Sequence, residues 1–158
     1  MDNSFSNQQF LRKRFWIFMG TTFVIYFLMR WLSGGLSSEQ IVAFEVAKSA
    51  TAVNNIMRGW DESLRQDYLW SIYIDYFLLV AYSGFLFYAC RYTALLSRND
   101  VVAGAAGFFS WLAPLAGLMD AIENSGMIYT IRVNVYEAVV HFTYDMAVVK
   151  FSLLLIVV

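Results

Sequence analysis

The stretch that decides the fold is residues 68–90, YLWSIYIDYFLLVAYSGFLFYAC, in which Asp75 is the only charged residue. A helix of about 20 apolar residues crosses the roughly 30 Å hydrocarbon core of a bilayer. Strands of a membrane barrel would instead alternate apolar and polar side chains over about 10 residues, and this stretch shows no such alternation. It therefore predicts a membrane-spanning helix.

Three further stretches are long and apolar enough to cross a bilayer: residues 15–32, 105–127 and 138–158. The first follows Arg12, Lys13 and Arg14, as the apolar part of a signal peptide would. Arg30 separates that apolar run from the small residues that come after it. We therefore expect the segment to be retained as a membrane anchor.

The composition of the whole chain agrees with these spans. Of its 158 residues 59% are hydrophobic and 15% are charged, against about 25% charged residues in an ordinary soluble domain. A soluble domain of this length buries only about 70% of its surface, which leaves no place for so many apolar side chains. A water-soluble enzyme and a disordered chain are excluded. The single Cys90 excludes an internal disulfide, and the near balance of 11 basic and 12 acidic residues argues against a nucleic-acid partner.

These segments predict an all-α fold, a single transmembrane domain over residues 1–158 built as a four-helix bundle. Loops on the cytoplasmic side of membrane proteins are enriched in Lys and Arg. Basic residues precede the first span and connect the second to the third: Arg12, Lys13, Arg14, Arg91 and Arg98. We expect both termini to be cytoplasmic.

The loop between the first two spans predicts an amphipathic helix over residues 38–58. Ser37 and Gln40 have the spacing of a capping box at its start. Its apolar residues cover about half of the helical circumference. Such a helix lies flat at the membrane interface, caps the end of the bundle or docks a partner, and the sequence favours the cap.

Polar residues within the spans are the candidate functional residues, since ionisable groups are costly in a bilayer. Each predicted span places some of them at a similar depth, in the half of the membrane near residues 38–58: Arg30; Asp75; Asp120, Glu123 and Asn124; His141 and Asp145. Tyr82 lies on the same helix face as Asp75. We predict that these side chains form one ligand-binding cluster. Lys150 faces the opposite side of its helix from His141. We expect its side chain to point away from the cluster and extend toward the cytoplasmic membrane surface, or to meet a partner subunit.

Several roles remain open for this cluster. Its members could stitch the helices together, bind a lipid headgroup or another small ligand, or relay protons. His141, Asp145, Asp120 and Glu123 are metal-ligand types, but one histidine without an H-E-x-x-H pattern is a weak signal. No cofactor is predicted. Because the carboxyl groups outnumber the nearby cations, we expect at least one of them to be neutral or paired with a bound cation.

Short motifs distributed along the chain carry a resemblance. They are Phe44-Glu45 with Trp60, Asp75-Tyr76 with Tyr82, and Pro114 followed by Asp120-x-x-Glu123-Asn124. With these, from about residue 36 to residue 130, the chain resembles a group of small bacterial four-span membrane proteins of uncharacterised activity. The resemblance implies the four-span topology and the importance of the acidic and amide residues in the second and third spans. It implies no reaction. We expect a location in a bacterial inner membrane.

The sequence favours a non-catalytic accessory or scaffold subunit of a larger membrane complex. It contains no glycine-rich phosphate loop, Ser-His-Asp set or Cys-x-x-Cys motif, and the fourth span carries enough charge to benefit from a neighbour. The expected partners are membrane lipids and other membrane subunits or a second copy of the chain. The alternative is a small enzyme or binding protein for a lipid or lipophilic ligand, which would use the acid and histidine cluster.

Overall fold

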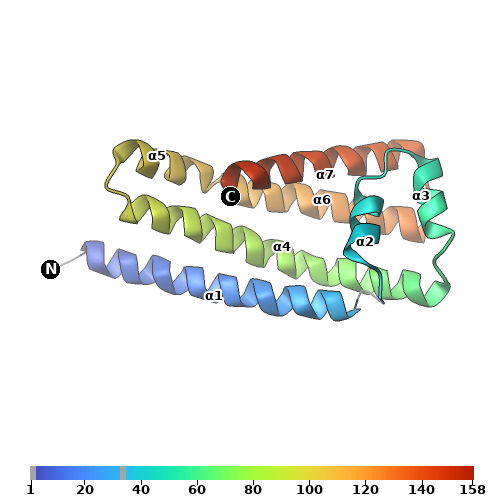
Figure 1. The fold of residues 1–158 in the computed structure, drawn as a ribbon, viewed down its shortest axis with the longest axis horizontal. Helices are drawn as coiled ribbons and strands as arrows, with labels where there is room; N and C mark the ends of the chain where they lie inside the picture. The colour runs from blue at the N-terminus through green and yellow to red at the C-terminus, as the bar shows by residue number, and fades with distance from the viewer. Residues whose placement is uncertain (1–2, 33–34) are drawn as a thin grey trace.

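The computed structural model describes residues 3–32 and 35–158, and these form helices joined by short loops, with no strand among them (Figure 1). The long elements are α1 (Asn3–Leu32), α4 (Glu62–Leu96), α5 (Asp100–Phe109) continued by α6 (Leu112–Arg132), and α7 (Glu137–Val157). They provide four helical segments long and apolar enough to cross a membrane. The all-α class and the four spans predicted from the sequence are confirmed.

The helices extend beyond the apolar stretches that reveal them. Helix α1 begins at Asn3 rather than near residue 15, and α4 begins at Glu62 rather than near residue 68. At the start of α4 the side chain of Asp61 accepts a hydrogen bond of 2.8 Å from the amide of Leu64. Such a cap satisfies one of the free amides of the first turn, so the helix continues past the end of its apolar part.

The third predicted span is two helices, because α5 ends before Ser110 and α6 begins at Leu112. Pro114 has no amide hydrogen to donate to the carbonyl of Ser110 four residues earlier, and its ring crowds that carbonyl. The hydroxyl of Ser110 donates instead to the carbonyl of Gly107 at 2.7 Å. The helix is therefore interrupted just before Pro114.

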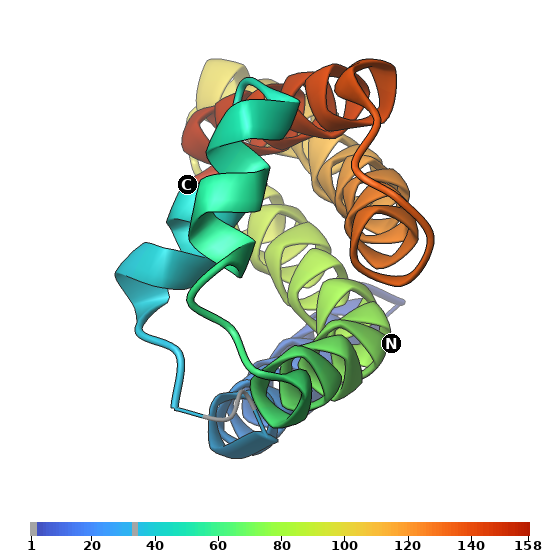
Figure 2. The ribbon, with the colours of Figure 1, turned by 90° about the vertical axis from the view of Figure 1, so that its right-hand side faces the viewer.

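The four spans pack in chain order around an arc (Figure 2). Helix α1 packs against α4, α4 against α6, and α6 against α7. Small residues allow the close approaches that membrane helices need. A Cβ atom at Gly117 on α6 would meet the hydroxyl of Ser83 on α4, and one at Gly126 would meet the hydroxyl of Thr143 on α7. Gly117 and Gly126 thus set the spacing of α6 from its two neighbours.

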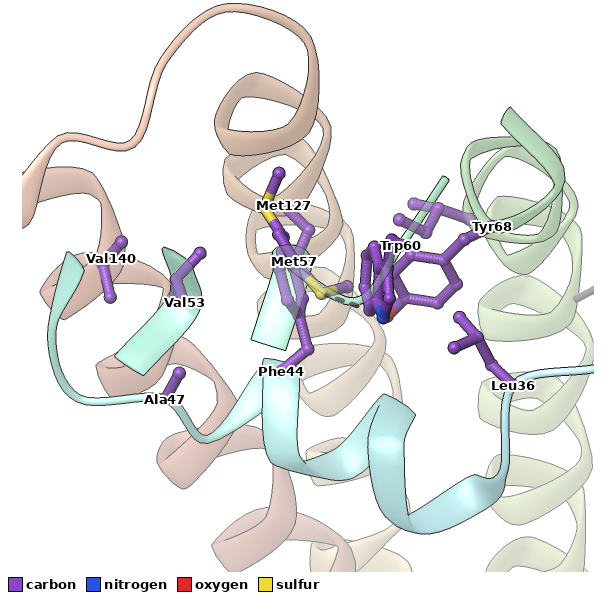
Figure 3. Close-up of a cluster of buried hydrophobic side chains, with 10 residues drawn as sticks. Leu36, Phe44, Ala47, Val53, Met57, Trp60, Tyr68, Met127 and Val140 are labelled. Carbon is purple, nitrogen blue, oxygen red and sulfur yellow. Dashed lines mark hydrogen bonds between the residues drawn. The ribbon is translucent and has the colours of Figure 1, made fainter. Parts of the chain in front are cut away.

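Helices α2 (Ser38–Glu45) and α3 (Ala50–Met57) lie across one end of the arc, which we term the capped end (Figures 1 and 2). Their apolar side chains pack onto α4, α6 and α7 through a buried cluster (Figure 3): Leu36, Phe44, Ala47, Val53, Met57, Trp60, Tyr68, Ile72, Met127 and Val140. Within it the rings of Phe44, Trp60 and Tyr68 have centroids 5.2 to 5.8 Å apart. The interpretation of this segment as a cap is confirmed.

The cap is not the single helix predicted over residues 38–58. The capping box at its start is present, with Ser37 Oγ accepting from the amide of Gln40 and Gln40 Oε1 accepting from the amide of Ser37. The helix stops at Glu45, and Ser49 then starts a second one by accepting a hydrogen bond of 3.2 Å from the amide of Ala52. Serine competes well for backbone amides, so an internal Ser49 breaks the helix that the apolar pattern alone suggests.

Candidate functional site

Lys150 of α7 lies at the centre of a buried group of acidic side chains, with 5% of its surface exposed. Its Nζ is 2.7 Å from Glu123 Oε2, 3.2 Å from Asp120 Oδ1 and 3.8 Å from Glu45 Oε2. The prediction that Lys150 points away from the polar residues is wrong. Its side chain leaves α7 on the face that packs against α6, where the carboxylates lie.

The acidic and amide residues of α4 and α6 are held by further contacts around that lysine. Asp120 Oδ2 accepts a hydrogen bond of 2.8 Å from the hydroxyl of Tyr82. Asn124 Nδ2 donates to Asp75 Oδ2 at 2.7 Å. We call this group the polar cluster, and its members are Glu45, Asp75, Tyr82, Asp120, Glu123, Asn124 and Lys150. The structure therefore brings together the candidates predicted on the second and third spans.

A small cavity borders the polar cluster directly beneath the cap. Its volume is about 50 Å³, and its polar lining comes from Arg30, Glu45, Ser71, Asp75 and Asn124. A bound water occupies about 30 Å³, so this space suits a water molecule or an ion of similar size. Arg30 reaches the cavity from α1, and its Nη1 also donates to the carbonyl of Leu36 at 2.8 Å.

His141 and Asp145 lie outside the polar cluster, contrary to the predicted grouping. The Nε2 of His141 is 3.2 Å from Glu137 Oε1, and both side chains are more than half exposed. Asp145 is exposed and makes no hydrogen bond or ion pair with the described residues. Residues five apart on a helix point about 140° from each other, so Lys150 facing inward turns Asp145 outward.

The candidate metal ligands are separated by the same rotation of α7. Asp120 and Glu123 lie in the polar cluster, whereas His141 and Asp145 lie on the outer face of the helix. Over residues 3–32 and 35–158, no three or more His, Cys, Asp or Glu side chains are grouped so that they could hold a metal ion. The metal site considered from the sequence is therefore not formed by these four residues.

The polar cluster contains more acidic than basic side chains. Four carboxyl groups, on Glu45, Asp75, Asp120 and Glu123, face Lys150 and the nearby Arg30. Glu123 is fully buried, and its Oε1 has no hydrogen-bond partner among the described residues. An isolated charge in an apolar interior costs several kcal/mol. The arrangement thus favours the uptake of a positive charge.

Glu45 is the member of the polar cluster that the cap contributes. Burial raises the pKa of its carboxyl above the ordinary value of 4.5, Lys150 acts in the opposite direction, and Asp120 adds to the increase. Its side chain keeps 16% of its surface exposed, whereas that of Glu123 keeps none. Glu45 is therefore more exposed than Asp120 and Glu123.

Sequence reasoning missed Glu45 and Lys150 as members of the site. A signal for Lys150 was present, because a group of buried acids needs a cation and Arg30 alone is too few. Glu45 directly follows Phe44, whose ring is buried against α4. Glu45 is also four residues after the apolar Ile41, so the two share the helix face that packs on the bundle.

Comparison with known proteins gives no assignment: no family model, no curated protein and no solved structure matches this chain. The motifs that carry the resemblance described above nevertheless meet in space. Glu45, Asp75, Tyr82, Asp120, Glu123 and Asn124 all belong to the polar cluster. The geometry of this cluster is therefore the basis for a functional proposal.

Proposed function

We propose that this chain is a small membrane protein that reversibly binds a proton in the polar cluster beneath its cap. The observation that supports this most is the excess of carboxyl groups, four against Lys150 and Arg30, of which Asp120 and Glu123 are buried and Glu45 and Asp75 partly buried. Uncompensated charges inside a bilayer are strongly unfavourable, and intramembrane acids commonly serve as proton carriers. The cluster lowers its energy by taking up positive charge.

The space beside the cluster favours a proton over larger ligands. The cavity of about 50 Å³ has room for a water molecule that could carry a proton, but not for a phospholipid headgroup. A metal ion would need several converging ligands, and no such group exists within the described part of the chain. Within the alternatives considered from the sequence, the site is thus closest to a proton relay.

Exchange with water is expected at the capped end. The cavity borders Ile41 and Glu45 of α2, so the cap forms one of its walls. Glu45 is partly exposed and its Oε2 lies 3.8 Å from Lys150 Nζ. Burial raises its pKa above the ordinary value, which favours the protonated form of this carboxyl group. A proton would enter at Glu45 and pass from there to the buried Asp120 and Glu123.

Infrared spectroscopy of the protein in lipid nanodiscs tests this proposal. A protonated carboxyl group has a C=O stretching band distinct from that of a carboxylate, and solvent isotope exchange reports its accessibility. We expect such a band near neutral pH, and we expect Glu123→Gln or Asp75→Asn to remove or shift it. Asp145→Asn is the matched control, because Asp145 is exposed outside the cluster.

The outcomes of that measurement are distinct. Loss of the band in a cluster variant but not in Asp145→Asn supports proton binding in the cluster. If the folded parent protein shows no protonated carboxyl across the neutral pH range, the proposal is wrong. The cluster would then serve only to hold the helices together.

A second candidate function is that of an accessory or scaffold subunit, which the outer face of α7 favours. Asp145 is exposed there without a partner, about 12 Å along the helix from Glu137 at ~1.5 Å per residue. A lone carboxylate facing lipid is costly, and a donor on a neighbouring subunit or copy would satisfy it. Purification from native membranes in mild detergent should then yield a complex that Asp145→Ala weakens. A monodisperse isolated chain would contradict this role.

A further inference from the structure

The end of the molecule opposite the cap carries a groove between the first turns of α1 and the last turns of α4, which lie side by side (Figure 1). Its volume is about 390 Å³, and it is lined by Arg12, Phe15, Trp16, Ala89, Tyr92 and Thr93. Its floor is therefore apolar and aromatic. Its polar groups are the Arg12 guanidinium, contributed by α1, and the hydroxyls of Tyr92 and Thr93, contributed by α4.

We propose that this groove binds an anionic phospholipid, with the phosphate of its headgroup held by Arg12 and Thr93 and an acyl chain along Phe15 and Trp16. Both polar side chains are exposed, and neither makes a hydrogen bond or ion pair with other described residues. Arginine is well suited to phosphate, since its planar group donates two hydrogen bonds in parallel.

The position of the groove matches the level of lipid headgroups. Arg12 and Arg30 on α1 are about 27 Å apart at ~1.5 Å per residue, close to the roughly 30 Å of a hydrocarbon core. Arg12 thus marks one edge of the bilayer while Arg30 marks the other. Trp16 and Tyr92 add the aromatic side chains that are enriched at this level.

Charge at this end is almost entirely positive. The basic residues are Arg12, Lys13, Arg14, Arg91 and Arg98, and all are exposed. Asp100 at the start of α5 is the only acidic residue that the described chain places here. Each Lys or Arg near a membrane surface adds about 1 kcal/mol of attraction to anionic lipid. The groove is therefore complementary to a negative headgroup, and it is independent of the polar cluster.

Native mass spectrometry of the delipidated protein tests this site with phosphatidylglycerol and phosphatidylcholine of the same acyl chains. We expect the parent protein to prefer phosphatidylglycerol and Arg12→Gln to weaken its binding about fivefold. Thr93→Val should weaken it by a smaller factor. Arg58→Gln is the matched control, since it removes the same charge from an exposed position on the cap.

Three results would overturn the proposal. The first is equal binding of the two lipids to the parent protein. The second is a loss in Arg58→Gln as large as in Arg12→Gln, which would indicate an effect of net charge alone. The third is displacement of the lipid by inorganic phosphate at similar concentration, which would make the site one for free phosphate.

Discussion

Helix α7 carries charged side chains on two faces, and the two faces meet very different surroundings. On one face Lys150 is buried among Glu123, Asp120 and Glu45. On the other, Glu137 and His141 pair with each other at the surface, and Asp145 has no partner within the described chain. The outer face has more polar residues, yet the inner face is the one that builds the site.

The difference shows that charge complementarity chooses the buried face of a helix with two polar faces. Helix α6 presents Asp120 and Glu123 toward α7, with Asp75 of α4 hydrogen-bonded to Asn124 beside them. Turning Asp145 inward would add another negative charge to this group, whereas turning Lys150 inward supplies a positive one. Like charges in a medium of low dielectric repel strongly, so only the orientation with Lys150 inside is stable.

Replacing Lys150 should produce the largest effect. Lys150→Met keeps the length of the side chain but leaves the neighbouring carboxylates without their cation. Removing one partner of a buried ion pair costs about 3–5 kcal/mol in the free energy of unfolding. Reversible unfolding of the purified protein in mixed micelles measures this loss. His141→Ala on the outer face is the control, and we expect a change within about 0.5 kcal/mol.

A double variant separates charge from packing in that experiment. Lys150→Met combined with Glu123→Gln removes both members of the shortest ion pair, which spans 2.7 Å. It should recover part of the stability lost in Lys150→Met, since less charge is left unpaired. If Lys150→Met alone is as stable as the parent, the burial of this lysine among the acids is contradicted.

The fold could be predicted from the sequence because each membrane span can be recognised from the hydropathy of its own segment. Residues 68–90 contain one charge and nothing else that a bilayer rejects, so the span is evident without knowledge of its neighbours. The break between Val46 and Ser49 was not visible in this way. It depends on whether the Ser49 side chain caps a new helix or stays within the old one, and both are compatible with the same apolar pattern.

The members of the site could be predicted only where the pattern within a single helix shows which residues face the interior. Asp75, Tyr82, Asp120, Glu123 and Asn124 lie on α4 and α6, whose packing follows from their small residues and polar stripes. Which face of α7 is buried depends instead on the total charge that the surrounding helices place next to it. That total was visible as an excess of acids, but the sequence led us to expect a neutral carboxyl group or a bound cation rather than Lys150.

The second prediction compares two tyrosines near these faces. Tyr82→Phe removes the hydroxyl that donates to Asp120 Oδ2 at 2.8 Å, and leaves that buried oxygen with one partner fewer. The expected loss of unfolding free energy is about 1–3 kcal/mol. Tyr144→Phe is the matched control, because its ring already contacts the Lys48 ammonium at 5.0 Å and keeps that contact without the hydroxyl. Equal losses in the two variants would contradict the hydrogen bond to Asp120.

The third prediction concerns the pH dependence of the cap. Burial raises the pKa of Glu45 above 4.5 in the folded protein, so the docked cap favours the neutral carboxyl. This contribution to stability is present below the unfolded pKa and is lost as the pH rises through the raised folded value. Amide hydrogen exchange across α2 should therefore increase over that pH range. Its intrinsic pH dependence is removed by reference to the unfolded peptide.

Glu45→Gln should abolish this pH dependence, because glutamine is neutral at every pH and so keeps the form that the docked cap favours. Glu39→Gln on the same helix is the control, since Glu39 is exposed and should leave the pH dependence in place. If both variants retain the slope of the parent protein, Glu45 is not the residue responsible.

The smallest effect is expected on the outer face, where Glu137 anchors the cap to α7. Its Oε2 accepts a hydrogen bond of 2.7 Å from the amide of Ala50, while its Oε1 lies 3.2 Å from His141 Nε2. Ala50 is the first residue of α3, so Glu137 satisfies an amide that no residue within that helix can satisfy. Losing a capping acceptor costs about 0.5–1 kcal/mol. Hydrogen exchange in residues 50–57 should accelerate by a few fold in Glu137→Ala.

His141→Ala removes the other contact of Glu137 but leaves the bond to Ala50 intact, so exchange there should match the parent. If His141→Ala loosens α3 as much as Glu137→Ala does, the outer face holds the cap through the ion pair rather than through the hydrogen bond to the helix start.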